Sequence, residues 1–301
     1  MADVASKTEM LTLASGRRVA VEGYGDPRGE PVFFFHGWPS SRWQGEVVSE
    51  AAGALGVRLL SVDRPGVGGS DYHPERTLLD WPPLLAEIAD ALGCARFRVM
   101  AISGGGPYAL AAAWALPERV IAAAVCCGAP PLAERADVSA LLPVYRWMLR
   151  LYRRHPQVMR RYFHFVRPLA TIRPPRWLFR LMLKTLPAPD AAVLADPATF
   201  NRKWLAYAGA WTGARDGLYG DARIYAQPWG FQPEDIRVPV RLWHGKADAS
   251  FHWTLAAELA ARIPGCTARF LDDEGHYSIA FRHCGEILRD LLATPEAGRA
   301  P

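Results

Sequence analysis

A serine in a strand-to-helix turn is the first candidate for chemistry in this chain. Residues 97–102 are apolar and predict a buried strand, which leads directly into Ser103, a run of glycines and an alanine-rich helix. Such a turn exposes a serine hydroxyl above a sheet, where it can act as a nucleophile. Small residues two positions away on either side, Ala101 and Gly105, allow close packing of strand and helix, although glycine is usual at the first position. The alternative is a glycine-rich turn with an incidental serine.

A histidine and an aspartate follow the last two predicted strands. His276 comes after Gly275 in a loop before a helix, and it is the only one of the eight histidines with this context. It would take the proton of Ser103 and later give it to the leaving group. Asp248 lies in the short loop after the preceding strand, where it would orient His276 and stabilise its charged form.

Other assignments of the acid remain open. Asp248 could instead be a carboxylate that caps a helix N-terminus. Asp272 and Asp273 lie too near His276 in the sequence to be favoured, and after the strand before Asp248 the nearest acid is Glu134.

Two glycine-containing loops follow early strands. The segment His-Gly-Trp-Pro at residues 36–39 has the form of a loop that supplies an oxyanion donor, so the backbone N–H groups of Trp38 and Gly104 are the expected pair. One such donor stabilises a transition state by on the order of 3–4 kcal/mol. His36 itself is predicted to be structural. The loop at 63–71 lacks the Lys-Ser/Thr of a phosphate-binding loop and is also predicted to be structural.

Apolar runs that alternate with helical patterns would position these residues. A hairpin is predicted over 10–13 and 18–22, because Ser-Gly separates two short runs. The later strands are expected at 32–35, 58–62, 97–102, 120–126, 240–243 and 268–271. Helices are expected at 43–55, 84–92, 107–116, 253–263 and 281–292. Continuous apolar strands alternating with helices predict an α/β fold with a mostly parallel central sheet flanked by helices.

One connection is too long for a loop. More than a hundred residues separate the strand ending near residue 127 from the strand beginning near 240, and their pattern is helical with several prolines. A structureless segment of that length is implausible in a compact domain. We therefore expect a core domain made of 1–130 and 229–301, with a helical cap inserted at 131–228.

The charge of the chain is concentrated in this cap. The net charge is +5, yet no acid occurs between Asp137 and Asp190, a stretch with eleven Arg or Lys. A basic field of this kind can attract anionic lipid, nucleic acid or an acidic substrate, and the alternative is a solvated face of amphipathic helices. No nucleic-acid-binding module is recognisable, so no nucleic-acid partner is expected. Weak, salt-sensitive contact with an anionic membrane surface stays a hypothesis, and the oligomeric state is open.

The cysteines and the first residues of the chain carry few functional signals. The five cysteines have no spacing typical of zinc ligands, so reduced core thiols and no metal site are predicted. The first ten residues contain no apolar signal segment, and no apolar run approaches the roughly 20 residues of a membrane span. A cytoplasmic location is therefore the expectation.

The order Ser103, Asp248, His276, together with the oxyanion loop, resembles the α/β-hydrolase superfamily over nearly the whole chain. The cap is the least matched part. The resemblance implies the α/β-hydrolase fold with an inserted helical cap, a nucleophile elbow at Ser103 and a catalytic triad. It favours the esterase and lipase-like branch over epoxide hydrolases and haloalkane dehalogenases, which use Asp where this chain has Ser103.

The expected reaction is hydrolysis of a carboxylic ester through an acyl-enzyme on Ser103, with no metal or organic cofactor. An aromatic stripe in the cap, Trp204, Tyr207 and Trp211, could line an apolar pocket, which weakly favours a hydrophobic small-molecule substrate, although such a stripe is usually core packing. The same triad could serve C–C bond, lactone or amide hydrolysis or acyl transfer, because fold does not settle the reaction. A ligand-binding protein without turnover is the remaining alternative.

Overall fold

A sheet of eight strands forms the centre of the molecule. The computed structural model describes residues 7–133 and 135–295, so Glu134 lies outside the described residues. The strand order is β1-β2-β4-β3-β5-β6-β7-β8. The strands are β1 (Lys7–Thr12), β2 (Arg18–Gly25), β3 (Glu30–Phe35), β4 (Val57–Val62), β5 (Phe97–Ile102), β6 (Val120–Cys126), β7 (Val240–Gly245) and β8 (Thr267–Leu271).

The direction of the strands agrees with the expected mostly parallel sheet. β1 and β2 form the antiparallel hairpin, and β2 runs antiparallel to β4. All other neighbours are parallel. Parallel strands need crossover connections, which are usually helices and which cover both faces of the sheet.

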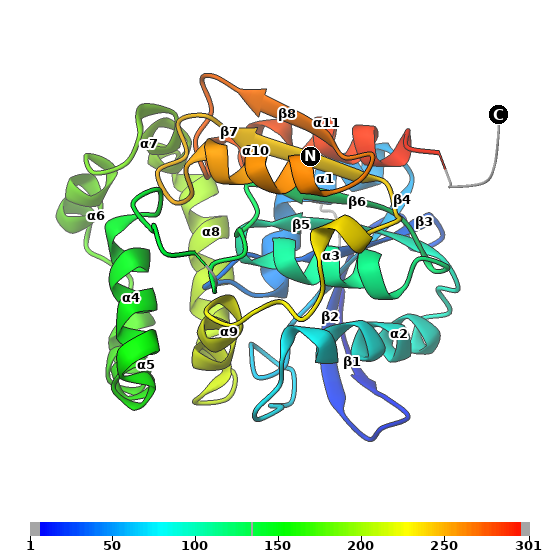
Figure 1. The fold of residues 1–301 in the computed structure, drawn as a ribbon, viewed down its shortest axis with the longest axis horizontal. Helices are drawn as coiled ribbons and strands as arrows, with labels where there is room; N and C mark the ends of the chain where they lie inside the picture. Colours follow the sequence, from blue (N-terminus) through cyan, green and yellow to red (C-terminus); the bar gives the residue numbers. More distant parts are fainter. Residues whose placement is uncertain (1–6, 134, 296–301) are drawn as a thin grey trace.

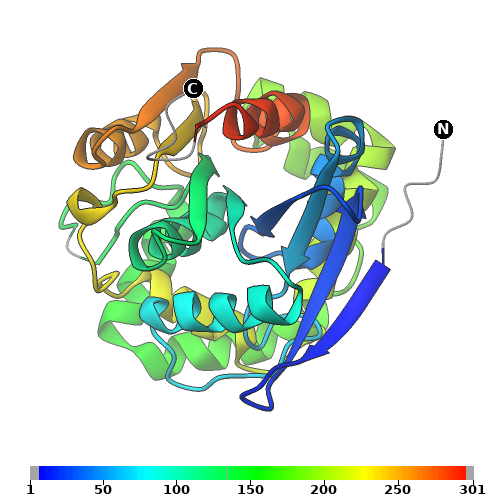
Figure 2. The ribbon, with the colours of Figure 1, turned by 90° about the vertical axis from the view of Figure 1, so that its right-hand side faces the viewer.

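Helices cover both faces of this sheet (Figure 2). The α-helices are α1 (Glu46–Ala54), α2 (Trp81–Ala91), α3 (Gly106–Ala115), α4 (Pro143–Arg154), α5 (Pro156–Ala170), α6 (Arg176–Leu183), α7 (Ala188–Ala195), α8 (Pro197–Ala210), α9 (Gly217–Tyr225), α10 (Trp253–Arg262) and α11 (Ser278–Leu292). Phe33 and Phe35 of β3 pack with α2 and α3, and Phe34 packs on the other side with α1 and α11. Because successive strand residues point to opposite faces, a continuous apolar run is what a strand covered on both faces requires.

Some helix boundaries differ from those expected. The predicted helix over 43–55 is a short 3-10 turn (Arg42–Gly45) followed by α1. The helix predicted from residue 84 begins at Trp81, because prolines are tolerated in the first helical turn. The helix predicted from residue 281 begins at Ser278.

The helices α4 to α9 lie between β6 and β7 in the chain and form a cap on one side of the sheet (Figure 1). Met159 and Phe163 of α5 pack with Trp211 and Leu218 in a separate apolar cluster. Val67, from the predicted structural loop at 63–71, completes that cluster and so joins the cap to the core. Within the described residues, none of the helices combines the length and apolarity that a membrane crossing requires.

Candidate active site

Ser103 occupies a strained turn between β5 and α3. Its backbone φ is +54°, in the left-handed region that costs a non-glycine residue about 1–3 kcal/mol. Neighbouring glycines allow the chain to approach closely there. A Cβ on Gly105 would collide with the carbonyl oxygen of Phe35, and one on Gly106 would lie 2.9 Å from the Cα of Gly128. Tight packing on both sides therefore holds the turn in this conformation.

The three predicted triad residues come together at the ends of β5, β7 and β8. Nε2 of His276 lies 3.0 Å from Oγ of Ser103, and Nδ1 of the same ring lies 2.7 Å from Oδ2 of Asp248. Burial alone would lower the pKa of His276, but the charge of Asp248 and its hydrogen bond outweigh burial and hold the pKa well above its ordinary value. Serine, imidazole and carboxylate in this sequence of contacts can pass the hydroxyl proton to the ring.

Asp248 is fixed by contacts on both of its oxygens. Oδ1 accepts the backbone N–H groups of Ser250 at 2.7 Å and Phe251 at 3.0 Å. Oδ2 faces His276 and also Nε2 of His244 at 3.2 Å. Burial would raise the pKa of Asp248, but the two histidines outweigh it and hold the pKa far below its ordinary value, so the carboxylate is ionised. It is not the cap of α10, whose N-cap position is His252.

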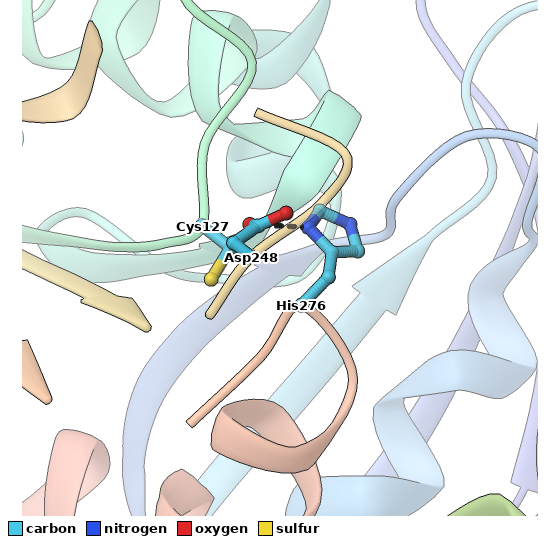
Figure 3. Close-up of side chains that lie close together, drawn as sticks. All are labelled: Cys127, Asp248 and His276. Carbon is cyan, nitrogen blue, oxygen red and sulfur yellow. Dashed lines mark hydrogen bonds and ion pairs between the residues drawn. The ribbon is translucent and has the colours of Figure 1, made fainter. Parts of the chain in front are cut away.

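A cysteine thiol lies beside the same pair. Cys127 follows β6, and its Sγ lies within 4.8 Å of ligand atoms of Asp248 and His276 (Figure 3). Burial raises the pKa of the Cys127 thiol well above its ordinary value, so at neutral pH it is neither a nucleophile nor a ready metal ligand. Because Asp248 and His276 are already bonded to each other, this cluster is better described as part of the packing around the triad.

The predicted oxyanion residues also lie next to Ser103. A Cβ on Gly104 would lie 2.8 Å from the Cβ of Trp38, and one on Gly37 would lie 3.3 Å from the Cβ of Ser103. The backbone N–H of Gly37 is bonded to the side chain of Gln44 at 2.6 Å. The two loops that carry Trp38 and Gly104 therefore meet at Ser103, as an oxyanion hole there would require.

A buried arginine is bonded to the loop that carries Trp38. Arg64 donates to the carbonyl oxygens of His36 at 2.5 Å and Gly37 at 2.9 Å. Asp221 of the cap helix α9 accepts from Nε of Arg64 at 2.8 Å. His36 is fully buried and bonds within the loop, which agrees with a structural role. From the same cap helix, Tyr225 donates its hydroxyl proton to the carbonyl oxygen of Gly104 at 2.9 Å.

A second cap carboxylate holds the loop that carries His276. Asp190 of α7 is almost fully buried and accepts the backbone N–H groups of His276 at 3.0 Å, Tyr277 at 2.8 Å and Ser278 at 2.9 Å. A Cβ on Gly275 would collide with this carboxylate, so glycine is required there. No local motif marks Asp190; its one sequence signal is that it is the first acid after the acid-free stretch.

Two cavities adjoin Ser103, and both are lined in part by the cap. The first is mostly apolar, and its lining includes Leu132, Met148, Leu149, Met159, Tyr225 and Phe251. The lining of the second includes His276, Arg202 and Lys203. Tyr145 and Trp38 line both cavities.

The predicted aromatic stripe is divided among different places. Tyr207 lines the second cavity with Ser103. Trp211 lines an outer groove of the cap. Trp204 packs between Phe200 and Tyr207, with ring centroids 6.3 and 5.5 Å away.

Comparison with known proteins identifies the fold and the family of this chain. A non-heme chloroperoxidase from Streptomyces lividans is 30% identical over 135 residues, which span 43% of this chain and 48% of that protein, or about half its length. An alpha/beta hydrolase fold protein from Nakamurella multipartita superposes with a TM-score of 0.66 at 24% identity, covering 94% of this chain and 99% of the other. The esterase RhEst1 from Rhodococcus sp. ECU1013 superposes with a TM-score of 0.69 at 17% identity, covering 95% and 99%. At these identities the solved structures support the fold alone. The family model described as "Alpha/beta hydrolase family" matches residues 32–289, and the chain therefore belongs to that family.

Proposed function

We propose that the protein is a serine hydrolase that cleaves the carboxylic ester of a hydrophobic small molecule through an acyl-enzyme on Ser103. The observation that carries this proposal is the unbroken set of hydrogen bonds from Ser103 through His276 to Asp248. The apolar cavity next to Ser103 supports a hydrophobic acyl or alcohol group, because it offers few polar partners.

The reaction would take place in two halves. Ser103 Oγ attacks the ester carbonyl carbon while its proton passes to Nε2 of His276, and the N–H groups of Trp38 and Gly104 stabilise the oxyanion. The intermediate collapses, and the alcohol leaves with the proton of His276. Water then gives a proton to His276 and attacks the acyl carbon, which releases the acid and restores the Ser103 hydroxyl.

The test is hydrolysis of p-nitrophenyl esters from acetate to palmitate by the wild type and by Ser103→Ala. We expect turnover by the wild type and a loss of roughly a millionfold in the variant, because removing a serine nucleophile disables the whole relay. Ser15→Ala, an exposed serine far along the chain, is the matched control and should keep full activity. The chain length with the highest kcat/KM would report the size of the cavity.

A serine-directed phosphonate separates two outcomes. If folded wild type forms an adduct on Ser103 but turns over no ester, the relay works and the bond is of another kind, with C–C, lactone and amide substrates or acyl transfer to be assayed next. If no adduct forms, the serine mechanism is wrong and a ligand-binding role without turnover gains support.

A further inference from the structure

The outer helices of the cap expose large apolar side chains. Phe165 is 73% exposed, Ile172 63% and Leu169 57%, and Val158 is also exposed. These four residues are spaced by seven, four and three positions, so they follow one stripe along α5 and the turn after it. A row of large exposed apolar side chains of this kind is typical of an interaction site rather than of ordinary surface.

Exposed apolar side chains on α4 and α6 add to this stripe. Trp147 of α4 is 45% exposed, and its ring lies 5.1 Å from that of Tyr162 of α5. Figure 1 shows α4, α5 and α6 on the side of the cap that points away from the sheet. The outer cap face is defined here by its exposed apolar residues, Val144, Trp147, Val158, Phe165, Leu169, Ile172, Trp177, Leu181 and Met182.

The same segment is strongly cationic. Residues 138–189 contain eleven Arg or Lys and no acid. Arg160 is neutralised by Asp216 of the segment before α9. Among the residues that the structure describes, no ion pair is recorded for Arg146, Arg150, Arg154, Arg161, Arg176, Arg180 and Lys184. The segment that carries the outer cap face therefore combines exposed apolar groups with a large excess of positive charge.

Exposed apolar groups together with positive charge indicate which partner would bind this face. A second copy of the chain would bring two cationic faces together, and like charges repel. A boundary between anionic headgroups and acyl chains satisfies both properties, because it offers negative charge to the arginines and an apolar layer to the aromatic side chains. We propose that the outer cap face docks on an anionic lipid bilayer, with Phe165, Leu169 and Trp177 at the acyl boundary and the arginines against lipid phosphates.

The face is continuous with the catalytic pocket. Val144 and Leu169 belong both to the outer cap face and to the wall of an apolar groove between α4, α5 and α8. Tyr145 and Met148 line that groove and also the apolar cavity of Ser103. A docked bilayer would thus lie at the entrance of an apolar path to the nucleophile. Entry of substrate by this path rests on the proposed function, whereas docking itself does not.

Co-sedimentation with vesicles tests the docking. The full chain should sediment with phosphatidylcholine vesicles that contain phosphatidylglycerol and not with phosphatidylcholine alone, and added salt should weaken binding because it screens the charges. Ser103→Ala should bind like the wild type, so a failure of the proposed hydrolysis would leave this result intact.

Two double variants separate the charged and apolar contributions. Arg176→Gln/Arg180→Gln should weaken binding about 25-fold, at roughly fivefold for each positive charge near the surface. Phe165→Ser/Leu169→Ser should weaken it by at least about tenfold at every salt concentration, because less apolar area is buried. The matched controls lie on the core domain. Lys7→Gln/Arg28→Gln removes two exposed charges, and Met10→Ser removes an exposed apolar side chain; both should bind like the wild type.

Three outcomes would overturn the proposal. The first is equal binding, or no binding, to neutral and anionic vesicles. The second is binding that neither double variant weakens more than its control. The third is self-association of the wild type in sedimentation velocity that Phe165→Ser/Leu169→Ser abolishes while vesicles are not bound, since the face would then serve a second copy of the chain.

Discussion

At the scale of single residues, the protonation state of His276 controls the proposed reaction. Only a neutral imidazole can accept the proton of Ser103. Burial lowers the pKa of His276, but Asp248 raises this pKa by more than burial lowers it. The pKa therefore lies well above its ordinary value of 6.5. We therefore expect kcat/KM to rise with increasing pH along an acid limb centred above 6.5, as measured with a p-nitrophenyl ester.

Asp248→Asn should move that limb to lower pH and reduce kcat about 10⁴-fold, because the raising charge and the correct tautomer of His276 are both lost. His283→Asn removes a partly exposed histidine of α11 that also contacts carboxylates, and it should leave the limb unchanged. A wild-type limb at or below 6.5 would contradict the assignment of Asp248 as the partner of His276.

The arrangement of the candidate site could be predicted from the sequence where local patterns mark its residues. Ser103 lies between a strand and a helix, and His276 and Asp248 follow strands, so each has its own signature. Asp190 and Arg64 have none, because their partners are distant in the chain. Asp190, for example, contacts backbone groups 86 to 88 positions away. Only the packed cap brings such residues to the site.

At the scale of elements, Asp190 links α7 of the cap to the histidine loop. Its carboxylate accepts the N–H group of Ser278, the first residue of α11, and the N–H groups of the two residues before it, so it fixes the point where the histidine loop enters the helix. Asp190→Ala would leave these groups unpaired and let the loop of His276 shift. Since a displacement of about 1 Å can cost 10²-fold in rate, we expect kcat to fall about 10- to 100-fold, with a smaller change in KM.

Asp196→Ala is the matched control, because Asp196 caps the exposed start of the cap helix α8 and has no contact with the site. It should lower stability slightly and leave kcat unchanged. Asp190→Glu, which keeps the charge, should recover part of the activity. If Asp190→Ala retains full kcat, the cap does not position His276 through this residue.

The strands and helices of the core could be predicted from the sequence. Both faces of the sheet are covered by helices, and its strands therefore consist of continuous apolar runs such as Phe33 to Phe35. The arrangement of the cap helices could not be predicted in this way. These helices pack on one another and on Val67 through residues that are distant in the chain, and helical spacing within each segment does not specify those partners. The aromatic stripe shows the consequence, since Tyr207 lines a cavity beside Ser103 whereas Trp204 packs against other aromatic rings.

At the scale of the whole molecule, one buried charge cluster fastens the cap to the core. Asp221 of α9 pairs with Arg64 and Arg76 of the core, and all three side chains are almost fully buried. Tyr108 of α3 also donates to Asp221, at 2.8 Å. Removing the charge of Asp221 would leave two guanidinium groups buried without compensation. We expect Asp221→Asn to lower the free energy of unfolding by about 3–5 kcal/mol, as measured by urea denaturation.

The pH dependence of the stability lost in Asp221→Asn tests whether the charge of Asp221 is the cause of that loss. Burial would raise the pKa of Asp221, but Arg64 and Arg76 outweigh it and lower the pKa from 3.8 to about 2. A carboxyl group with a lowered pKa stabilises the folded state fully above its unfolded pKa, and this contribution disappears as the pH falls through the folded value. The difference in the free energy of unfolding between wild type and Asp221→Asn should therefore be constant near neutral pH and shrink between pH 3.8 and about 2.

The control variant Asp71→Asn breaks the exposed pair with Arg18 and should cost only about 0–1 kcal/mol of stability. A loss for Asp221→Asn as small as that of Asp71→Asn would mean that packing of the cap, and not this buried charge cluster, holds the two parts together.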